Sequence, residues 1–564
     1  MRSGEMALVG IAVLPVAAAL VSYLFGSVWR RVVTLSAGTV TLLLAVVVAS
    51  RVSGGGRISV GSFLSADSLS AIFLLVTAFL YAATALFSIG YLAGKGSGGS
   101  GGRKGSRGRQ GSSGEGRGQK QGSNGKEKSG GRDGGNSGSY AERFDRRFFT
   151  GLNIFCGAMS IALVLSNIAL IWVSIEVTTV VSALLVSLED TDRSSEAAWK
   201  YILIASMGLG LSLIGVLVLY AAAAPVLGVS HALQIGYLEH AHGLPAETTE
   251  LAFIFAVIGF GTKMGLAPMH TWLPDAHSEA PTPISALLSG SLLAVSFYAI
   301  LRFEQVTIHN AGSAFPHDVL ASFGVFSLLI AALFLLVQRD MKRMFAYSSV
   351  EHMGIIAIGA SFGVPIALAG VMLHVISHGL AKGTAFFGAG SFKTKFGTKD
   401  IGRITGGISA LPWSGPLLLA AVAALSALPP FAIFRSEFMI VYGGMQSGGG
   451  IGVVMLLVLV TLAFAGLSWH TIKMVMSPGA TAYVRGANSA AGIVDVGSTV
   501  DPDSDSVAVA SHLASPGKSG EPSIWMVIPM LVGIAGLLLL GIHPPAGFLH
   551  LMDSAARELS GGIS

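Results

Sequence analysis

The chain has 564 residues, of which 52% are hydrophobic and only 12% are charged, and its mean hydropathy is +0.69. This composition indicates a polytopic membrane protein rather than a soluble one. The net charge of +5 does not indicate a nucleic-acid partner, because much of the excess base lies in polar inserts. Cys156 is the only cysteine, which excludes an internal disulfide and a thiolate-ligated iron–sulfur cluster on this chain.

Fourteen apolar segments have the length of about 20 residues that a membrane-spanning helix needs. The first, from about residue 6, is interpreted as a helix and not as a signal peptide, because no small-residue cleavage site precedes the next span. The sequence therefore predicts an all-α polytopic protein of about fourteen transmembrane helices. They start near positions 6, 31, 67, 148, 167, 199, 249, 281, 316, 344, 366, 412, 450 and 523.

Two inserts interrupt the apolar pattern. The first, at about Lys95 to Ser139, is rich in Gly and Ser with scattered Lys and Arg, and it lacks the apolar surface to fold. Such a basic run could bind nucleic acid or anionic lipid, but it has no interleaved aromatic residues, so a disordered cytoplasmic loop is expected. The second insert, at about Pro478 to Pro522, is more acidic and is expected to be a flexible cytoplasmic linker.

The short loops that carry Lys and Arg are expected in the cytoplasm. They alternate along the chain as fourteen spans require, and an even number of spans places both termini on the outer side of the plasma membrane. The opposite loops, such as 231–250, are nearly free of basic residues. The basic loops carry Arg30 and Arg31; Arg339, Lys342 and Arg343; and Lys393, Lys395, Lys399 and Arg403.

A lysine inside an apolar helix that a proline soon interrupts is the strongest functional signal before the midpoint of the chain. Lys263 precedes Pro268, and Glu176 lies in the middle of an earlier span. Charges and broken helices at membrane depth persist where they face protein or water inside a bundle, and they mark ion pathways. A movable Glu176 partner would make Lys263 a switchable proton site. Lys200 is a further candidate, although snorkelling to the interface explains it equally well.

The second half of the chain carries a related array. His374, His378 and Lys382 are spaced i, i+4 and i+8, so they project from one helix face, as a proton relay would require. A second broken helix at Pro429 and Pro430 is followed by Glu437. Two broken helices with ionisable groups are what an inverted-repeat transporter predicts. For Glu351 and His352, interface placement and proton uptake are both open.

The turn after Lys263 holds residue types that could bind a metal in isolation, namely His270, Trp272, Asp275 and His277. A metal site needs three or four convergent ligands. Polar residues in a proline-bounded turn more often satisfy freed backbone groups, so no metal is expected here. His270 is instead a candidate for passing protons to the cytoplasm.

Several motifs together resemble the antiporter-like membrane subunits of respiratory complex I, group 4 membrane-bound hydrogenases and Mrp-type cation/proton antiporters. They are KMGLAPMHTWLPDAHSEAPTPISALLSG, DMKRMFAYSSVEHMGI, the HxxxHxxxK helix and ALPPFAIFRSEF, and the resemblance covers most of positions 150 to 475. Within this superfamily, IEVTTVVSALLV, EAAWKYIL and LLAVSFYAILRF are most similar to hydrogenase-4 component F. The resemblance implies a fourteen-helix bundle with two inverted five-helix repeats, each with one broken helix.

The resemblance implies the following division of the chain. Three N-terminal transmembrane helices (1–94) and a disordered basic loop (95–147) precede the first antiporter-like repeat (148–303) and the second (316–475), which are followed by a flexible linker (476–522) and a C-terminal transmembrane helix with a tail (523–564).

The family's functional residues fall on positions already selected by their apolar surroundings. The helix-5 glutamate falls on Glu176, the broken-helix lysine on Lys263, and the carboxylate of helix 12 on Glu437. The helix-11 array falls on the stripe from His374 to Lys382. One departure is Ala294, which stands where many complex I relatives carry a central lysine, so the link between the two half-paths must use another group.

These observations predict a non-redox, proton-translocating subunit of a multi-subunit oxidoreductase, either hydrogenase-4-like or NADH dehydrogenase-like. Its expected partners are other membrane subunits, a soluble redox module, lipid and protons, with no nucleic acid. No cofactor is expected on this chain, whereas iron–sulfur clusters, and in a hydrogenase a nickel–iron centre, are expected on partner subunits. The alternatives are a Mrp-type antiporter subunit that moves Na⁺, the membrane partner of an inorganic-carbon uptake system, and a structural anchor.

Overall fold

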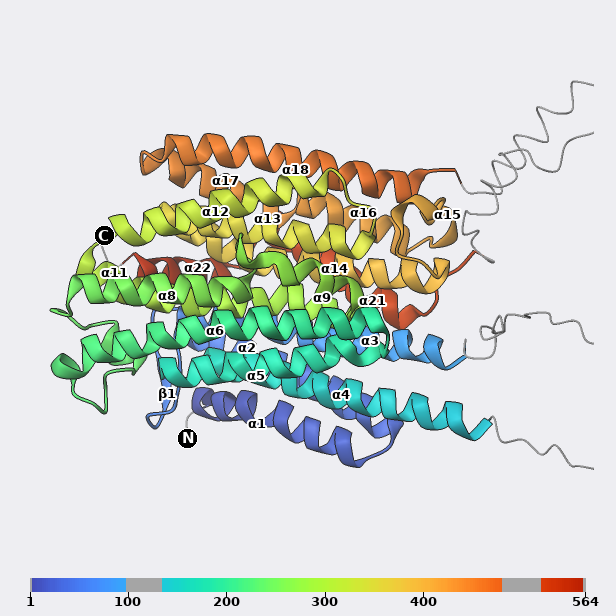
Figure 1. The fold of residues 1–564 in the computed structure, drawn as a ribbon, viewed down its shortest axis with the longest axis horizontal. Helices are drawn as coiled ribbons and strands as arrows, with labels where there is room; N and C mark the ends of the chain where they lie inside the picture. Colours follow the sequence, from blue (N-terminus) through green and yellow to red (C-terminus); the bar gives the residue numbers. More distant parts are fainter. Residues whose placement is uncertain (1–2, 98–133, 479–518, 561–564) are drawn as a thin grey trace, which may run out of the picture.

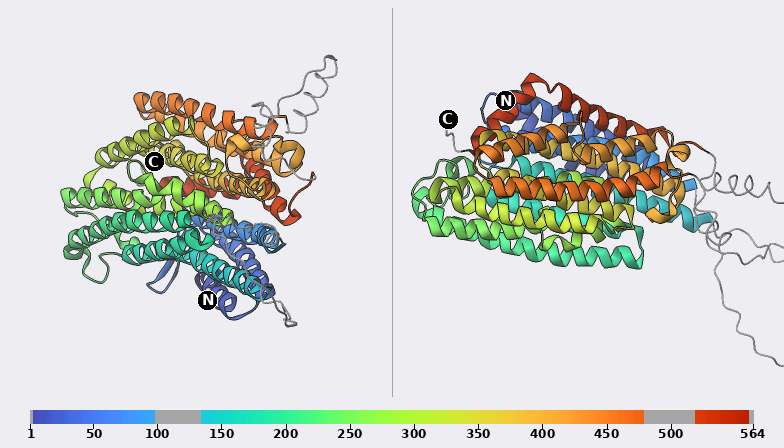
Figure 2. Two further views of the ribbon diagram at one scale, coloured as in Figure 1. Left: turned by 45° about the vertical axis from the view of Figure 1, so that its right-hand side comes forward. Right: turned by 90° about the horizontal axis from the view of Figure 1, so that it is seen from above.

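A computed structural model describes residues 3–97, 134–478 and 519–560. They form a bundle of helices whose axes are roughly parallel or antiparallel to one another (Figures 1 and 2). Within these residues, 12 segments are long and apolar enough to cross a membrane. The predicted all-α polytopic fold is therefore confirmed. The main helices of these segments are α1 (Ser3–Leu24), α2 (Ser27–Val52), α3 (Ser68–Ser97), α4 (Gly134–Val164), α5 (Ile168–Val186), α6 (Asp192–Leu227), α8 (Ala246–Met264), α11 (Leu293–Ala311), α12 (Ala314–Leu335), α14 (Pro365–Phe396), α18 (Gly450–Met476) and α21 (Ile524–Ile542).

Every predicted span coincides with helical structure, since each of the fourteen starting positions lies in a helix or within two residues of one. The two spans outside the group of 12 correspond to α13 (Met341–Ser361), which carries several charges, and to the pair α16 (Ser414–Leu425) and α17 (Ala432–Gln446). The exact number of membrane crossings and the inverted repeats stay predictions.

The remaining elements are short. Two antiparallel strands form a hairpin in which Ser59 pairs with Ser65. The short elements are β1 (Ile58–Val60), β2 (Leu64–Ala66), α7 (Ile235–Leu238), α9 (Trp272–Glu279), α10 (Thr282–Leu287), α15 (Gly407–Ala410), α22 (Ala546–Leu559), the 3₁₀ turns η1 (Ser187–Glu189), η2 (Met269–Thr271) and η4 (Ile401–Arg403), and the π-helical turn η3 (Leu288–Leu292).

Both predicted helix breaks are present. The α8 helix ends at Met264, because Gly265 has a φ of 86°, a left-handed conformation that glycine adopts without strain. The chain resumes as η2 and α9. In the second half, α16 ends at Leu425, Ala427 is left-handed with a φ of 49°, and α17 begins at Ala432. Each break frees backbone groups next to buried polar side chains.

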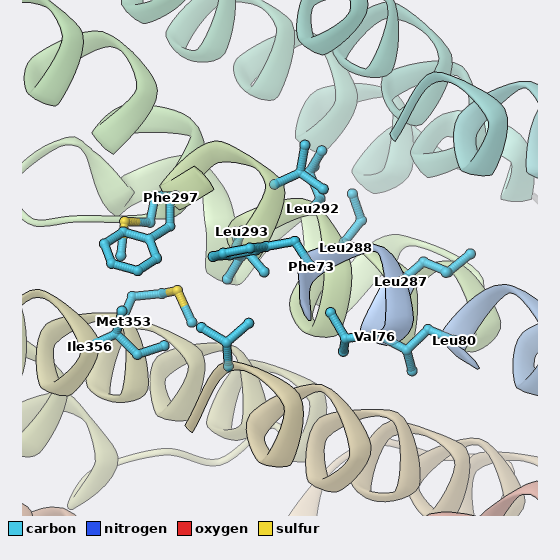
Figure 3. Packing of buried hydrophobic residues seen from close by; sticks show 14 of the residues in the cluster. Phe73, Val76, Leu80, Leu287, Leu288, Leu292, Leu293, Phe297, Met353 and Ile356 are labelled. Atoms are coloured by element: carbon cyan, nitrogen blue, oxygen red, sulfur yellow. The ribbon is translucent and has the colours of Figure 1, made fainter. Parts of the chain in front are cut away.

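The helix α14 lies between the two halves of the bundle, and 94% of its most apolar 18-residue stretch is buried. Figure 1 shows α5, α6 and α8 on one side of it and α12, α13 and α18 on the other. Near the centre of the bundle, Phe73 of α3 packs against Phe297 of α11 with ring centroids 6.2 Å apart. Figure 3 shows Leu293 and Met353 in the same apolar cluster. Ala294 also belongs to this cluster and is 2% exposed.

The boundaries of the first predicted insert need correction. The α4 helix begins at Gly134, so residues 134–147, assigned to the first loop, are helical, and α3 likewise includes residues 95–97. Hydropathy missed this extension of α4 because it contains the charged segment ERFDRR. Residues 98–133 of the first insert and 479–518 of the second lie outside the described part of the chain. The helix ends that flank both inserts lie at one end of the bundle, opposite the two chain termini (Figure 1). The side of the membrane on which the termini lie stays a prediction.

The C-terminal segment expected as a tail contains the helix α22, which packs on α3 and α14. Its Glu558 carboxylate accepts hydrogen bonds from the backbone N–H groups of Ser68 and Leu69, both at 3.2 Å. These are unpaired donors at the start of α3, where the helix dipole favours a negative charge. Burial and the nearby Asp67 carboxylate nevertheless raise the pKa of Glu558 to about 7.

This pKa predicts that the attachment of α22 weakens as the pH rises. In the folded protein Glu558 binds its proton more tightly than in the unfolded chain, where its pKa is 4.5. The stability that it contributes is therefore present at low pH and is lost between about pH 4.5 and 7. The Glu558→Gln variant should be more stable than the parent at pH 8, by about 2 kcal/mol, and show a flatter dependence of melting temperature on pH. Equal pH dependence in both proteins would contradict this prediction.

Candidate functional site

The first group of functional side chains surrounds Lys263, in the last turn of α8 before the helix break. Lys263 is fully buried. Its Nζ donates hydrogen bonds to the hydroxyl oxygens of Thr179 at 2.7 Å and Tyr201 at 2.6 Å. It also lies 4.9 Å from the centroid of the Tyr201 ring, within the range of a cation–π contact. Two hydroxyl groups and one aromatic face thus solvate the lysine inside the bundle.

Glu176 lies on the neighbouring helix α5, which is capped at its start by the side chain of Asn167. The two oxygens of its half-buried carboxylate accept from Ser206 at 2.9 Å and from Thr179 at 3.5 Å. Both Glu176 and Lys263 are described, and they form no ion pair within 4.0 Å; the Thr179 hydroxyl instead contacts both. The predicted Glu176/Lys263 pair is therefore bridged by a hydroxyl that sequence reasoning did not select.

The second group lies where α13, α14 and α17 meet. His374 of α14 has one ring nitrogen, Nε2, 3.0 Å from Nδ1 of His352 on α13, and the other, Nδ1, 3.0 Å from the Ser436 hydroxyl on α17. The ring of His378 lies 5.1 Å from that of His352. Glu437 follows Ser436 and is 8% exposed. The structure thus brings the predicted residues His374, His378 and Glu437 together.

Lys382 ends the polar stripe on α14 and is fully buried. Its Nζ donates to the carbonyl of Phe345 at 2.9 Å and to the hydroxyl of Ser348 at 2.5 Å, both on α13. Glu351, one turn farther along α13, is 3% exposed, and its Oε2 has no hydrogen-bond partner. Interface placement was open for Glu351 and His352, but both lie inside the bundle next to the stripe on α14.

Two buried groups were not selected as candidates for proton transfer. His277 of α9 is fully buried, stacks on Phe386 of α14 and has no partner for either ring nitrogen. Lys342 of α13 is also fully buried and donates to the carbonyls of Ser278 and Ala280. The sequence places Lys342 in a basic loop, because it stands beside Arg339 and Arg343, and this pattern does not indicate its burial. The two free ring nitrogens of His277 could not be inferred from the sequence.

Two other candidates lie apart from these groups. Lys200 is 38% exposed and pairs with Glu196 one turn away at 2.5 Å, which supports the snorkelling interpretation. It borders a cavity of about 350 Å³ that Asp275 and Arg343 also line. His270 is 8% exposed, and its ring lies 6.3 Å from that of Tyr347. Neither residue contacts Lys263 or the stripe on α14 through a described hydrogen bond.

Comparison with known proteins identifies the family. Residues 166–463 match the family described as "NADH:quinone oxidoreductase/Mrp antiporter, TM". The chain belongs to this family. The matched region contains both groups of buried side chains and both helix breaks.

Relatives of this antiporter family include a "Hydrogenase-4 component F homolog" of Methylacidiphilum infernorum, 42% identical over 284 residues, which are 50% of this chain and 60% of the relative. "NADH-quinone oxidoreductase subunit N" of Desulforudis audaxviator is 34% identical over 267 residues, or 47% of this chain and 52% of the relative. The chain thus spans between half and two thirds of the length of these relatives.

Solved structures of the same fold cover nearly the whole chain. A chain of the Mrp complex from Dietzia sp. DQ12-45-1b aligns with a TM-score of 0.73, at 17% identity, over 99% of this chain and 98% of that one. A chain of the archaeal membrane-bound sulfane sulfur reductase aligns with a TM-score of 0.72, at 18% identity, over 98% of each. Both alignments show that this antiporter-family chain shares their fold.

Proposed function

We propose that this chain is the proton-translocating membrane subunit of a multi-subunit redox complex of the hydrogenase-4 or NADH dehydrogenase type. The observation that carries the proposal is the set of buried ionisable side chains without a close counter-ion. Among the described residues, none of Lys263, Lys382, Glu351 and Glu437 forms an ion pair within 4.0 Å. Groups of this kind are costly in a membrane, so they are rare there and typically mark proton or ion pathways.

The contacts support a route in two parts. In the first, Thr179 contacts both Glu176 and Lys263, so a small shift of either side chain changes the stabilisation of the lysine proton. In the second, proton hops run along the stripe on α14, through the His352–His374 contact, to Glu437. Moving one charge through 100 mV requires about 2.3 kcal/mol, comparable with a shift of one or two pKa units.

The link between the two parts must use a group other than a central lysine, because Ala294 stands where many complex I relatives carry that lysine. His277 is a suitable group for this link. It lies on the segment that follows Lys263 and stacks on Phe386, one turn from Lys382 on α14. Its two ring nitrogens have no protein partner and are free to bond water. In this proposal, Lys200 and His270 pass protons between the cytoplasm and this path.

The energy source in this proposal is electron transfer on partner subunits. Iron–sulfur clusters, and in a hydrogenase a nickel–iron centre, would belong to a soluble redox module, because this chain has one cysteine, and it is buried. The 42% identity to a hydrogenase-4 component F homologue supports this assignment. The chain would lie in the plasma membrane with both termini outside.

The proposal is tested by purifying the complex in mild detergent and reconstituting it in liposomes. We expect co-purification with iron–sulfur proteins and acidification that requires an electron donor but not Na⁺. Electron-donor-independent Na⁺/H⁺ exchange would instead identify a Mrp-type antiporter. Co-purification with a zinc protein alone would favour the carbon-uptake system. Normal pumping after Glu176, Lys263 and Lys382 are all neutralised would leave only a structural anchor.

A further inference from the structure

Three potential metal ligands from three different helices converge in the second group. They are His352 of α13, His374 of α14 and Glu437 of α17, and one ligand atom of each lies within 4.8 Å of the others. All three side chains are buried, with exposures of 0%, 0% and 8%. This is the one group of three such residues that converges within the described part of the chain.

The surroundings of His374 prepare it as a ligand. Its Nδ1 is hydrogen-bonded to Ser436, and the Ser436 hydroxyl donates to the carbonyl of Ile433, so that hydroxyl accepts the imidazole proton. The proton then lies on Nδ1, and the lone pair of Nε2 faces His352. Metal-binding histidines are commonly oriented by such a hydrogen bond at their other ring nitrogen.

Several neighbouring atoms that could bind a metal ion have no hydrogen-bond partner. Glu437 Oε1 and His352 Nε2 are buried without a hydrogen-bond partner, and so are both ring nitrogens of His378. A buried polar atom without a partner destabilises the folded protein. A cation bound between the three ligands would satisfy the carboxylate and at least one of these nitrogens.

We propose that His352, His374 and Glu437 form a binding site for a divalent transition metal ion, of which Zn²⁺ is the best match. Two imidazoles and one carboxylate are a Zn²⁺ ligand set, with bond lengths of about 2.0–2.2 Å. Ligand atoms about 3.3 Å apart would suit a tetrahedral ion, so a small closing movement completes the site. His378, whose ring lies 5.1 Å from that of His352, or a water molecule supplies the fourth ligand.

A cavity of about 520 Å³ lies farther along the helices that carry His352 and His374. Its wall includes Ala360 and Leu368, which lie on the same helices as His352 and His374, about 12 Å and 9 Å farther along them by the helical rise. Glu304 also lines the cavity, with a carboxylate oxygen 4.0 Å from His317 Nε2.

A bound metal ion would occupy the same atoms that the proposed proton route uses. The ion would therefore block proton transfer through His374, and the two functions would exclude each other. Only this inhibitory effect rests on the proposed function; the binding site itself does not.

The test is a direct measurement of metal binding to the full-length protein purified in detergent. Co²⁺ is added and the ligand-field absorption is recorded, followed by competition with Zn²⁺. We expect one site per chain with a tetrahedral spectrum. His374→Asn and Glu437→Gln should each weaken binding at least ten-fold, and Ser436→Ala about ten-fold because it loosens the orientation of His374. The matched control is His543→Asn, which alters an exposed histidine and should leave binding unchanged.

Two results would overturn the proposal. One is the lack of a tetrahedral Co²⁺ spectrum in the parent protein, and the other is equal affinity in the control and the three site variants. Dye labelling of the buried Cys156 shows whether each variant is folded. Because binding is measured without an electron donor, a negative result would not bear on proton pumping. Conversely, a complex that binds Zn²⁺ but never pumps would leave the metal site standing.

Discussion

The Lys263→Ala variant is expected to lose proton pumping at least ten-fold while the complex still assembles. The lysine is the fully buried cation of the first group, and its Nζ is held by Thr179 and Tyr201. Alanine removes the only group at this position that can carry the charge. The two hydroxyls that lose their donor keep partners, since Thr179 also bonds Ile175 and Tyr201 bonds Ser182. The expected loss of stability is therefore small, about 1–2 kcal/mol.

Pumping is measured in liposomes by quenching of a pH-sensitive dye after addition of the electron donor. The matched control is Lys473→Ala, an exposed lysine in the last turn of α18, which should pump normally. A Thr179→Val variant tests the bridge to Glu176, and it should retain Lys263 but reduce pumping. Full pumping by Lys263→Ala would refute the proposed role of this residue.

The largest expected loss of stability comes from breaking the buried ion pair between Asp67 and Arg302. Arg302 is 3% exposed, and one of its terminal nitrogens lies 2.6 Å from both carboxylate oxygens of Asp67. A second terminal nitrogen bonds Glu239 at 2.9 Å. Replacing Arg302 with leucine leaves the Asp67 charge without its main partner, which typically costs about 3–5 kcal/mol. The measured quantity is the melting temperature, followed by a thiol-reactive dye at Cys156, which is the only cysteine and is buried.

A double variant separates the ion pair from simple packing. Asp67→Leu combined with Arg302→Leu should be more stable than Arg302→Leu alone, because no unpaired carboxylate remains. The pair also predicts a pH dependence. Burial opposes ionisation of Asp67, but Arg302 and Arg57 outweigh it and hold the pKa of Asp67 well below its ordinary value of 3.8. Its stabilisation is therefore complete at neutral pH and is lost as the pH falls below about 4. An Asp67→Asn protein with the same acid sensitivity as the parent would contradict this assignment.

The features of the fold that the sequence predicted are those set by local chemistry. The helix breaks were visible because Pro268, Pro429 and Pro430 disfavour continuation of a helix, and the spans were visible as apolar runs. Hydropathy did not reveal the start of α4, because this part of the helix extends beyond the apolar segment. It carries charges such as Arg146 and Arg147, which lower the hydropathy. The helix α22 was missed because its apolar residues occupy only one face.

The site was predictable only in part, for a related reason. His374, His378 and Lys382 lie on one helix, so their spacing alone places them on one face. The partners that complete the groups come from other helices, as Thr179 does for Lys263 and Ser436 does for His374. Serine and threonine are common in membrane helices, and no periodicity distinguishes the one that faces a lysine or a histidine from its neighbours. Packing between helices decides which serine or threonine faces the lysine or the histidine. A single sequence does not show that packing.

The burial of α14 limits how the protein can work. This 32-residue helix contacts α3, α10, α13, α16, α17, α21 and α22, so it has almost no surface along which it could slide. A large displacement of α14 would disturb most of the bundle at once, whereas rotation of a histidine ring or movement of a proton disturbs only its neighbours. The scaffold around the stripe is thus suited to stay fixed while protons, water molecules and side-chain rotamers change position within it.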